Sequence, residues 1–442
     1  MLSKSNKINE NYAAQVTIVK NLRQAPNADK LKMFTFQGNN ILSSSIEEGQ
    51  KVVYFPVECQ IHDSILSPMN LYRHSEKNSN PEVKGFFEDT GRVKALKLRG
   101  NYSEGFVLPV SEVAEIFNIS EDLFIVGESF DMINGKQITK KYIVYREPTT
   151  REGSGKRQKP IVRESKLVEG QFNLHRDTLK LGANMYHLLN NVDNVVTITK
   201  KLHGTSFVSS NVIIKKRLNF FNRIFKWLGL PLKDTEYGNL YSSRKVVKNE
   251  YFDDKKKYNH FYSEDIWGKA NNKIKDELLK GETVYGEIVG FTSEGSYIQR
   301  GYDYGCADGT FDIYIYRITH TNIDGKVVEL SYDQIAERAE QLGVKAVPLI
   351  WQGTAYDIVS NPELSNYVEH LDEESMEDAV MEYLKAKHVR DQDCNMCINK
   401  VPDEGICVTV GSLKMKTFKL KSSRFLQFES KELDKGEVNL EE

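Results

Sequence analysis

Short runs in which hydrophobic and polar residues alternate dominate the first part of the chain. Such alternation predicts strands, because successive side chains of a strand point to opposite faces of a sheet. Between residues 12 and 115 the predicted strands are Gln15–Val19, Lys32–Phe36, Lys51–Tyr54, Val93–Lys97 and Gly105–Leu108, separated by turn residues. Closely spaced short strands of this kind are typical of a small β-barrel.

A mixed pattern follows after residue 168. Strands are predicted at Val195–Thr199, Ser206–Val212, Glu282–Val289, Asp312–Ile318, Ile406–Val410 and Thr417–Leu420. Apolar residues at helical spacing predict helices at Tyr332–Leu342 and Ser375–Lys387. Residues 147–168 are rich in Pro, Gly, Ser, Thr and basic residues, which is typical of a connector. We therefore predict an α+β protein with domains at 1–146 and 169–442, joined by a basic linker at 147–168.

Composition narrows the class of protein. A chain of 442 residues suffices for two or three domains, and 40% hydrophobic with 28% charged residues is typical of globular proteins. The net charge of -2 excludes a uniformly basic nucleic-acid-binding protein, so any nucleic-acid site must be a local patch. The N-terminus lacks the apolar segment of a signal peptide, and no run of about 18 apolar residues occurs. We expect no membrane span and a cytoplasmic monomer, or a virus-encoded one acting in the host cytoplasm.

The cysteines predict a reducing compartment. Their number is low and odd, and they are scattered, which argues against a disulfide framework. They are Cys59, Cys306, Cys394, Cys397 and Cys407. Cys394 and Cys397 form a CxxC, but no second CxxC or HxxxH supplies the two further ligands that a structural zinc needs. We expect packed or free thiols there, with a metal site as the alternative.

Lys201 stands in the stretch TKKLHGTSF, residues 199–207. A lysine attacks only when it is neutral, and its ordinary pKa is about 10.4. A cationic, partly desolvated pocket would lower that pKa and allow attack on the α-phosphorus of a nucleotide. Gly204 would allow a turn that other residues resist. Because lysine is frequent in this chain, the stretch alone equally fits an ordinary strand end on the surface.

Charged residues further along the chain support the reactive lysine. Glu287 in YGEIVG and Glu404 in PDEGICV place carboxylates beside predicted strands, and Arg244 ends a third strand-like run. Lys419 and Lys421 alternate in FKLKSSRF, so a strand would present both on one face. Two ammonium groups on one face repel unless an anion such as a triphosphate lies between them. For a single Glu or Lys, a solvated surface charge is the usual explanation.

The order of these motifs resembles that of the covalent nucleotidyltransferases, which are the polynucleotide ligases and the mRNA capping enzymes. KLHGTSF, YGEIVGF, DEGICV and FKLKSSRF are similar to the first, third, fourth and fifth motifs of nick-sealing RNA ligases. PNADKL (residues 26–31) resembles a turn of OB-fold tRNA-binding domains, so an OB-like barrel is expected at 1–146. Only 21 residues follow Lys421, where DNA ligases and capping enzymes usually carry an OB domain. An OB module placed first resembles the Deinococcus-type RNA ligases.

The resemblance implies an ATP-dependent RNA ligase that seals 3'-OH and 5'-phosphate ends, with Mg²⁺ or Mn²⁺ and an RNA partner. It implies antiparallel sheets flanked by helices in the second domain, with Lys201 as the adenylated nucleophile. The implied nucleotide-binding residues are Lys200, Leu202, His203, Gly204, Arg244, Glu287, Tyr316, Glu404, Lys419 and Lys421. Glu287 and Glu404 are also the implied metal ligands, and Tyr316 is expected to stack on adenine, with Tyr314 on the same strand face as its alternate. Departures from the family pattern include His203 where many members have Asp, and Arg317 where an Asp follows the aromatic residue.

Three alternatives remain open. A DNA ligase and a capping guanylyltransferase would share the lysyl-nucleotide chemistry, and a non-catalytic RNA-binding protein could be built on the same fold. The basic stretch Lys215–Lys233 has apolar residues at helical spacing. It is expected to form a helix packed on the domain, and the alternative is a nucleic-acid clamp or a membrane-surface helix.

Overall fold

The computed structural model describes residues 1–144, 163–175, 177–218, 227–228, 234–252, 262, 264–368, 371, 375–411 and 414–436. Most of the expected linker 147–168 and of the basic stretch Lys215–Lys233 lies outside these residues, so both stay predictions. In the described part of the chain, no helix is long and apolar enough to cross a membrane.

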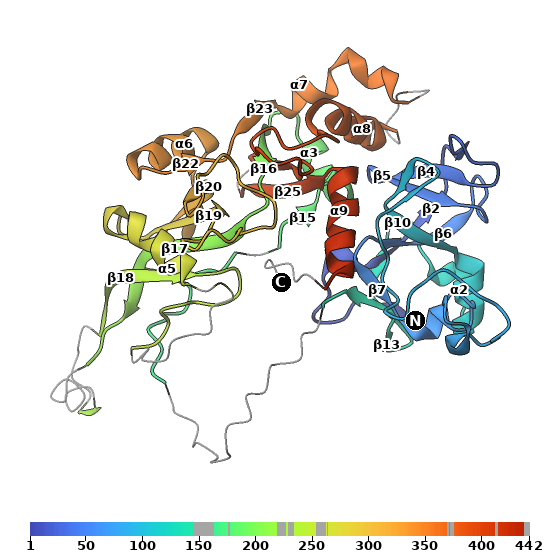
Figure 1. Ribbon diagram of the computed structural model, residues 1–442, viewed down its shortest axis with the longest axis horizontal. Coiled ribbons are helices and arrows are strands. Elements are labelled where there is room, and N and C mark those ends of the chain that lie inside the picture. The colour runs from blue at the N-terminus through green and yellow to red at the C-terminus, as the bar shows by residue number, and fades with distance from the viewer. Residues whose placement is uncertain are drawn as a thin grey trace.

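The N-terminal lobe, residues 1–144, is built from short antiparallel strands (Figure 1, blue to cyan). They are β1 (Leu2–Ser3), β2 (Ala14–Ile18), β3 (Arg23–Gln24), β4 (Lys32–Phe36), β5 (Asn39–Ser43), β6 (Lys51–Pro56), β7 (Cys59–Ile61), β8 (Leu96–Leu98), β9 (Asn101–Ser103), β10 (Gly105–Pro109), β11 (Ser129–Phe130), β12 (Met132–Ile133), β13 (Lys136–Gln137) and β14 (Thr139–Lys141). Its helices are α1 (Asp63–Leu66) and α2 (Val110–Phe117). Four of the five strands predicted here are confirmed as β2, β4, β6 and β10.

The fifth predicted strand, Val93–Lys97, is largely wrong. Its hydrophobic pattern is real, since Val93 and Ala95 are buried. Their backbone groups, however, bond to other partners: the amide of Val93 donates to the carbonyl of Cys59, and that of Ala95 donates to Oγ of Ser430. Only the end of the predicted run enters a strand, as β8.

The described strands of the N-terminal lobe do not close into a barrel. They divide into sheets ordered β10-β6-β2-β11, β3-β4-β5, β1-β12-β13, β14-β7 and β8-β9. Side chains interrupt the ladder beside β5, where the amides of Asn40 and Leu42 donate to a Glu104 carboxylate oxygen and to Ser103 Oγ. The closed barrel expected from strand spacing is therefore not observed.

The remainder of the chain forms two larger sheets. The Lys201 sheet has the order β15-β25-β24-β16-β23, and the Glu287 sheet has the order β18-β17-β19-β20-β21, with β22 on β20. The strands are β15 (Leu179–Lys180), β16 (Val195–Lys201), β17 (Thr205–Lys215), β18 (Thr235–Ser242), β19 (Glu282–Gly290), β20 (Phe311–Thr321), β21 (Val327–Glu329), β22 (Lys345–Ala346), β23 (Leu349–Thr354), β24 (Gly405–Gly411) and β25 (Lys416–Lys421). All six strands predicted in this part are confirmed, with longer ends.

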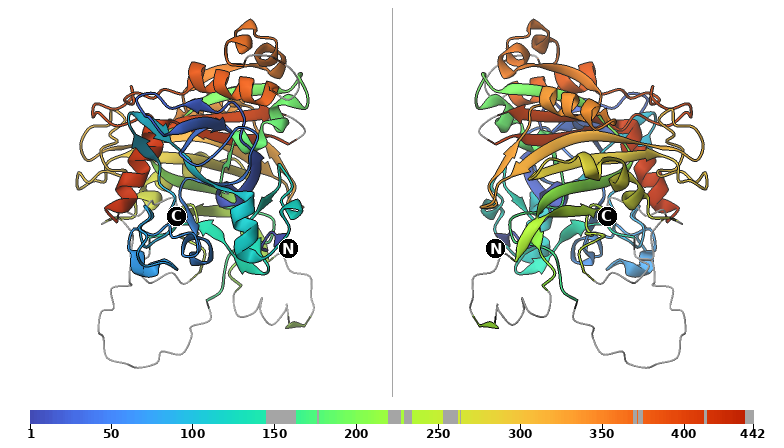
Figure 2. Two further views of the ribbon diagram at one scale, coloured as in Figure 1. Left: turned by 90° about the vertical axis from the view of Figure 1, so that its right-hand side faces the viewer. Right: turned by 90° about the vertical axis from the view of Figure 1, so that its left-hand side faces the viewer.

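Helices cover the outer faces of both sheets. They are α3 (Tyr186–Leu189), α5 (Ile266–Ile274), α6 (Tyr332–Gln341), α7 (Ala355–Val359) and α8 (Met376–His388), and a further helix, α9 (Ser423–Asp434), follows β25. The core of the Lys201 sheet includes side chains of α3, α7 and α8, and that of the Glu287 sheet includes side chains of α5 and α6. Figure 2 shows α7 and α8 (orange) beyond the strands of the Lys201 sheet. Both predicted helices are confirmed, as α6 and α8, and the fold is α+β as expected.

The last helix, α9, lies between the Lys201 sheet and the N-terminal lobe (Figure 1, red). Its residue Ser430 bonds to Glu58 and Ala95 of the lobe, so the two parts of the chain are in direct contact. A second contact joins α8 to the lobe, where Nζ of Lys385 bonds to the carbonyl of Gly38.

Candidate active site

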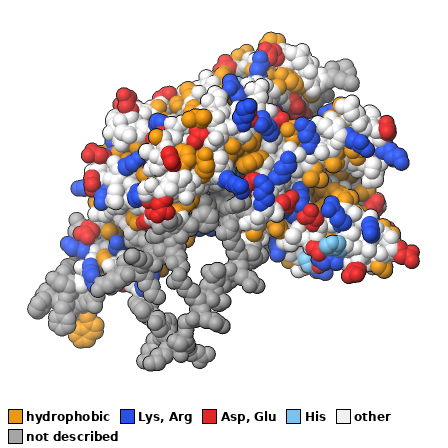
Figure 3. All heavy atoms as spheres, in the orientation of Figure 1, with side chains coloured by type: hydrophobic (Ala, Val, Ile, Leu, Met, Phe, Trp, Pro, Cys, Tyr) orange, Lys and Arg blue, Asp and Glu red, His pale blue; other side chains and the backbone are white. Residues whose placement is uncertain are grey.

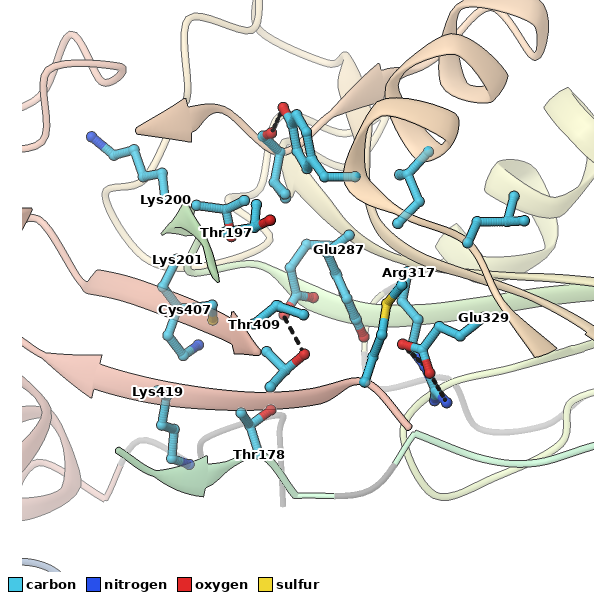
Figure 4. Close-up of a pocket in the computed structure, with 18 of the residues that line it drawn as sticks. Thr178, Thr197, Lys200, Lys201, Glu287, Arg317, Glu329, Cys407, Thr409 and Lys419 are labelled. Carbon is cyan, nitrogen blue, oxygen red and sulfur yellow. Dashed lines mark hydrogen bonds and ion pairs between the residues drawn. The ribbon is translucent and has the colours of Figure 1, made fainter. Parts of the chain in front are cut away.

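A cavity of about 330 Å³, here called the central cavity, lies between the two sheets (Figure 4). Both sheets contribute inward-facing side chains, because alternate residues of each strand point away from the helices. From the Lys201 sheet these are Thr197, Thr199, Lys201, Gln352, Cys407, Thr409, Thr417 and Lys419, and from the Glu287 sheet Ser206, Glu287, Tyr316, Arg317 and Glu329. The volume is within the range of small-ligand sites.

Lys201 is the last residue of β16 and points into the central cavity, whereas Lys200 points away (Figure 4). The Lys201 side chain is 11% exposed, and its Nζ lies 2.8 Å from Oε1 of Glu404. Nζ of Lys200 lies on the other side of the strand, 2.6 Å from Oδ2 of Asp403. Strand alternation thus separates the two neighbouring lysines, and only Lys201 presents its amine to the cavity.

Glu404 stands just before β24 and is almost completely buried. Its Oε1 contacts Lys201, and Nζ of Lys421 is 3.9 Å from the same oxygen. Its Oε2 is buried without a hydrogen bond among the described residues, and Nδ1 of His203 lies 4.0 Å from it. A buried carboxylate oxygen of this kind suits a hydrated divalent cation.

Glu287 enters the central cavity from the middle of β19, where it pairs with Ser206 of β17 and with Tyr314 of β20. It is 8% exposed. With Glu404 approaching from the Lys201 sheet, the two carboxylates expected from the sequence stand on facing sheets. Among the described residues, no group of three or more His, Cys, Asp and Glu side chains is arranged to hold a metal ion.

His203 and Gly204 lie beside the central cavity but do not line it. The ring of His203 packs edge-on against Tyr302 and Phe425, and its backbone amide donates to the hydroxyl of Tyr304. The chain bends at Gly204, but its φ is not in the left-handed region, so this is not a turn that only glycine adopts easily. A side chain is excluded there for another reason: a Cβ would meet the carbonyl oxygen of Ile288 on β19.

A bulge in β20 lies at Tyr316, one of the two candidate stacking residues. The register with β19 shifts between Tyr285 and Gly286, so Tyr316 has no direct partner in the ladder. Tyr316 lines the central cavity, and burial together with the charge of Glu287 raises its pKa. Tyr314 is buried in a cluster against which Tyr316 also packs, so both rings lie on one strand face as expected. Of the two, Tyr316 reaches the cavity lining and Tyr314 does not.

Two ion pairs frame the central cavity. Arg244, which is 10% exposed, pairs with Asp177 from the segment before β15. Arg317 donates from Nε to Oε1 of Glu329 at 2.8 Å and from its second terminal nitrogen to Oε2 at 3.0 Å. This two-point pair holds β20 to β21 and leaves the expected Asp position occupied by a fixed cation.

Lys419 and Lys421 share a face of β25, as predicted. Lys419 lines the central cavity, and both lysines line a smaller adjoining one, the junction cavity, which lies between β25 and the N-terminal lobe. Lys421 is held by Glu429 of α9, with Nζ 2.8 Å from each carboxylate oxygen.

The structure thus brings together around the central cavity seven of the eleven residues expected from the sequence. They are Lys200 and Leu202, whose chain passes the cavity, and Lys201, Arg244, Glu287, Tyr316 and Lys419. Glu404 and Lys421 touch this group through ion pairs. Sequence reasoning missed Asp177, Asp403 and Glu429, the partners of expected cations. Asp177 follows the run FNLHR and carries no signal of its own, and Glu429 is one of three acidic residues of α9.

The CxxC lies next to this group. Cys394 packs with Leu202 and Tyr304 in a buried cluster, and none of the five cysteines is in a disulfide bond. A hydrogen bond with Cys397 lowers the pKa of Cys394 to about 7.

Comparisons with known proteins agree with this geometry. The family model described as RNA ligase matches residues 194–421, just over half of the chain. An apo variant of Naegleria gruberi RNA ligase has 16% sequence identity and a TM-score of 0.54, covering 96% of this chain and 100% of its own. The same enzyme with pyrophosphate gives the same values, and a variant with ATP and manganese has 16% identity, a TM-score of 0.52 and coverage of 96% and 99%. No curated protein sequence matches. Because the family model spans most of the two sheets that form the cavity, the chain belongs to the RNA ligase family and is an RNA ligase enzyme.

Proposed function

We propose that this RNA ligase joins 3'-OH and 5'-phosphate RNA ends through a lysyl-adenylate on Lys201. The observation that carries the proposal is the placement of Lys201, whose amine enters the central cavity 2.8 Å from a buried carboxylate. In the first step, neutral Nζ attacks the α-phosphorus of ATP, a P–N bond forms and pyrophosphate leaves. In the second, a 5'-phosphate oxygen attacks the AMP phosphorus and frees Lys201. In the third, the 3'-OH attacks the 5'-phosphorus and AMP leaves.

The remaining residues divide between the base, the sugar and the phosphates. Tyr316 would stack on adenine, since an aromatic face is a general platform for a base. Arg244 would bind the 5'-phosphate or the ribose, and Glu287 would bind the ribose. Lys419 and Lys421 would contact the α-phosphate and stabilise the charge that develops as pyrophosphate leaves.

Glu404 and Glu287 would hold Mg²⁺ or Mn²⁺, because both are buried carboxylates and Glu404 keeps one oxygen without a hydrogen bond among the described residues. Such an ion supplies charge neutralisation for the phosphates when it is bound. His203, which packs between aromatic rings, would not be a ligand. The Naegleria enzyme, solved with ATP and Mn, with AMP and Mn and with pyrophosphate, supports this choice of nucleotide and metal.

We further propose that the substrate is a nick in a duplex, and that the N-terminal lobe is an OB-like module placed ahead of the ligase domain, as in the Deinococcus-type enzymes. The matched Naegleria chain covers the N-terminal lobe as well as the two sheets, which favours one shared architecture. Lys and Arg side chains gather across the middle of the face in Figure 3, where the two parts of the chain meet, and could attract a nucleic-acid backbone.

Labelling with α-³²P-ATP tests the first step. We expect acid-labile covalent label on the wild type, none on Lys201→Ala, and wild-type label on Lys326→Ala, an exposed lysine in the turn before β21. An unlabelled wild type, or label retained by Lys201→Ala, would contradict the proposal.

Ligation assays then identify the substrate. Faster sealing of splinted than of unsplinted RNA supports a nick, and equal rates contradict it. Faster sealing of a DNA-ended nick, or labelling by GTP instead of ATP, would assign the same chemistry to a DNA ligase or a guanylyltransferase.

A further inference from the structure

The N-terminal lobe anchors α9 at its C-terminal end. Ser430 donates its hydroxyl hydrogen to Oε1 of Glu58 and accepts a hydrogen bond from the amide of Ala95 at 3.0 Å. Arg92 donates to the carbonyl of Ser430 at 3.1 Å and also pairs with Glu58 and with Asp434. Ser430, Glu58 and Arg92 are all buried. The position of this helix end is therefore set by the lobe as well as by the Lys201 sheet.

The residue next to this anchor faces the proposed site. Glu429 precedes Ser430 and holds Lys421, with both oxygens 2.8 Å from Nζ. Their side chains are 12% and 14% exposed, so water screens the pair weakly. Helix α9 begins two residues after Lys421, where Ser422 caps it by accepting from the amide of Phe425 and donating to the carbonyl of Asp403. Lysine and glutamate are thus fixed on adjoining, rigid segments.

Lys421 stands between two carboxylates that compete for it. Glu429 lies at 2.8 Å, and Oε1 of Glu404 at 3.9 Å. That same oxygen of Glu404 holds Lys201 at 2.8 Å. If Glu429 lost its charge, attraction would draw Lys421 toward Glu404, where it would compete with Lys201 for one oxygen.

The junction cavity also disfavours an extra positive charge near Lys421. Lys180, which lines this cavity with Lys419 and Lys421, has its pKa lowered to about 8, mainly by burial and in part by the charge of Lys421. Glu429 is one of three glutamates that line the same cavity, with Glu58 and Glu104. With a neutral residue at position 429, the three lysines of the junction cavity would have less negative charge around them to balance their own.

We propose that Glu429 is a positioning residue of the nucleotidyl-transfer site, which holds Lys421 off Glu404 and is itself held in place by the N-terminal lobe through Ser430. The inference rests on the proposed function, because it assigns Lys421 a part in the transfer of AMP. It gives the N-terminal lobe a role in the first chemical step, which needs no RNA.

The role predicts a particular kinetic signature. Lys421 acts on charge that develops as pyrophosphate leaves, so a displaced Lys421 weakens transition-state binding more than binding of ATP. Single-turnover labelling with α-³²P-ATP, measured over a range of ATP concentrations, separates the two. For Glu429→Gln we expect the rate at saturating ATP to fall about tenfold, with the half-saturating ATP concentration within about twofold of wild type.

Three variants complete the experiment. Glu429→Asp keeps the charge and is expected to recover part of the rate. Glu432→Gln makes the same charge change on α9 in a residue that pairs with Lys435 and is expected to label like wild type. Ser430→Ala loosens the anchor in the lobe and is expected to slow labelling less than Glu429→Gln, in protein whose folding is checked by its melting temperature.

The outcomes separate the two proposals. Wild-type rates in folded Glu429→Gln, or faster labelling, would overturn the positioning role and leave Glu429 at most a competitor of phosphate. A rise in the half-saturating ATP concentration with an unchanged rate at saturating ATP would overturn it too. So would an equal fall of that rate in Glu432→Gln. If Glu429→Gln does not fold, unchanged rates in both Glu429→Asp and Ser430→Ala would do the same. An unlabelled wild type, or a labelled Lys201→Ala, contradicts the proposed function instead.

Discussion

Replacing Gly204 by alanine tests the close approach of the Lys201 strand end to β19. A Cβ at this position would lie 2.9 Å from Cγ1 of Val289, and the carbonyl oxygen of Ile288 is nearer still. To restore the 3.4 Å of ordinary contact, the chain must shift by at least about half an ångström. The backbone carbonyl cannot turn aside, because Ile288 is paired with Thr205 and Ile313 in the sheet.

The expected cost follows from this geometry. Overpacking a filled site costs about 1–3 kcal/mol, and alanine regains about 0.4–1 kcal/mol by restricting the unfolded chain. The net loss of roughly 1–2 kcal/mol lowers the melting temperature by about 1–4 °C, since the unfolding entropy of a chain this long is large. Because Lys201 and Glu287 flank the displaced segment, a shift of this size is expected to slow ATP labelling by about tenfold.

Calorimetry and single-turnover labelling measure the two effects. Gly238→Ala is the matched control on β18, since the nearest atoms to its Cβ belong to the movable end of the Ile214 side chain. We expect that control to cost less than about 1.5 kcal/mol and to label normally. Wild-type melting and labelling in Gly204→Ala would refute the argument from close approach.

Three further predictions concern single groups. Burial raises the pKa of Glu58 to about 7, although the charge of nearby Arg92 acts in the opposite direction. The carboxyl of Glu58 therefore binds a proton more tightly in the folded state than in the unfolded chain. Its contribution to stability is complete below about pH 4.5 and is lost as the pH rises through about 7. The difference in unfolding free energy between wild type and Glu58→Gln, taken from melting curves, should therefore change by up to roughly 3 kcal/mol across this range. A difference that stays constant with pH would contradict the raised pKa. The hydrogen bond with Cys397 lowers the pKa of Cys394 to about 7, so a thiolate absorbance titration of wild type minus Cys394→Ala should have its midpoint near pH 7, and Cys397→Ala should move it upward; a midpoint above pH 8 in wild type would disprove this. Tyr316→Phe keeps the ring and should bind ATP within about twofold of wild type, whereas Tyr316→Ala should weaken binding by about tenfold, and equal binding by both would exclude stacking.

Ion pairs hold the lysine side chains of the site in place before a nucleotide binds. Glu404 contacts Lys201, while Glu429 contacts Lys421. These contacts keep the two amines apart on β16 and β25, which lie on either side of β24, ready for an anionic substrate. Burial makes the arrangement effective, since a charge with water around it would be screened.

Much of the fold followed from local pattern. Strands β16, β17, β19, β20, β24 and β25 carry hydrophobic runs long enough to be predicted without a partner, because each is buried in a packed sheet. Helices α6 and α8 were predicted in the same way. The run Val93–Lys97 was wrongly predicted as a strand because its amides donate to Cys59 of β7 and to Ser430 of α9. A pattern of five residues carries no information about such distant partners.

The site was predictable to the extent that motif residues carry it. Lys201, Glu287, Tyr316 and Lys419 reach one cavity as the motif order implied. The roles of the residues that follow Lys201 were not predictable from the motifs. His203 packs between aromatic rings, and Gly204 is needed because a side chain would not fit, not because of a left-handed φ.

By itself, the sequence determined which residues carry the chemistry and which segments become strands, since both depend on residue type and short spacing. The tertiary structure decided which side chains meet. Packing placed Tyr316 and not Tyr314 in the cavity lining, strand alternation turned Lys200 away from the cavity, and α9 brought Glu429 to Lys421. These outcomes depend on packing between segments far apart in the chain, where a shift of one residue in register redirects every side chain that follows.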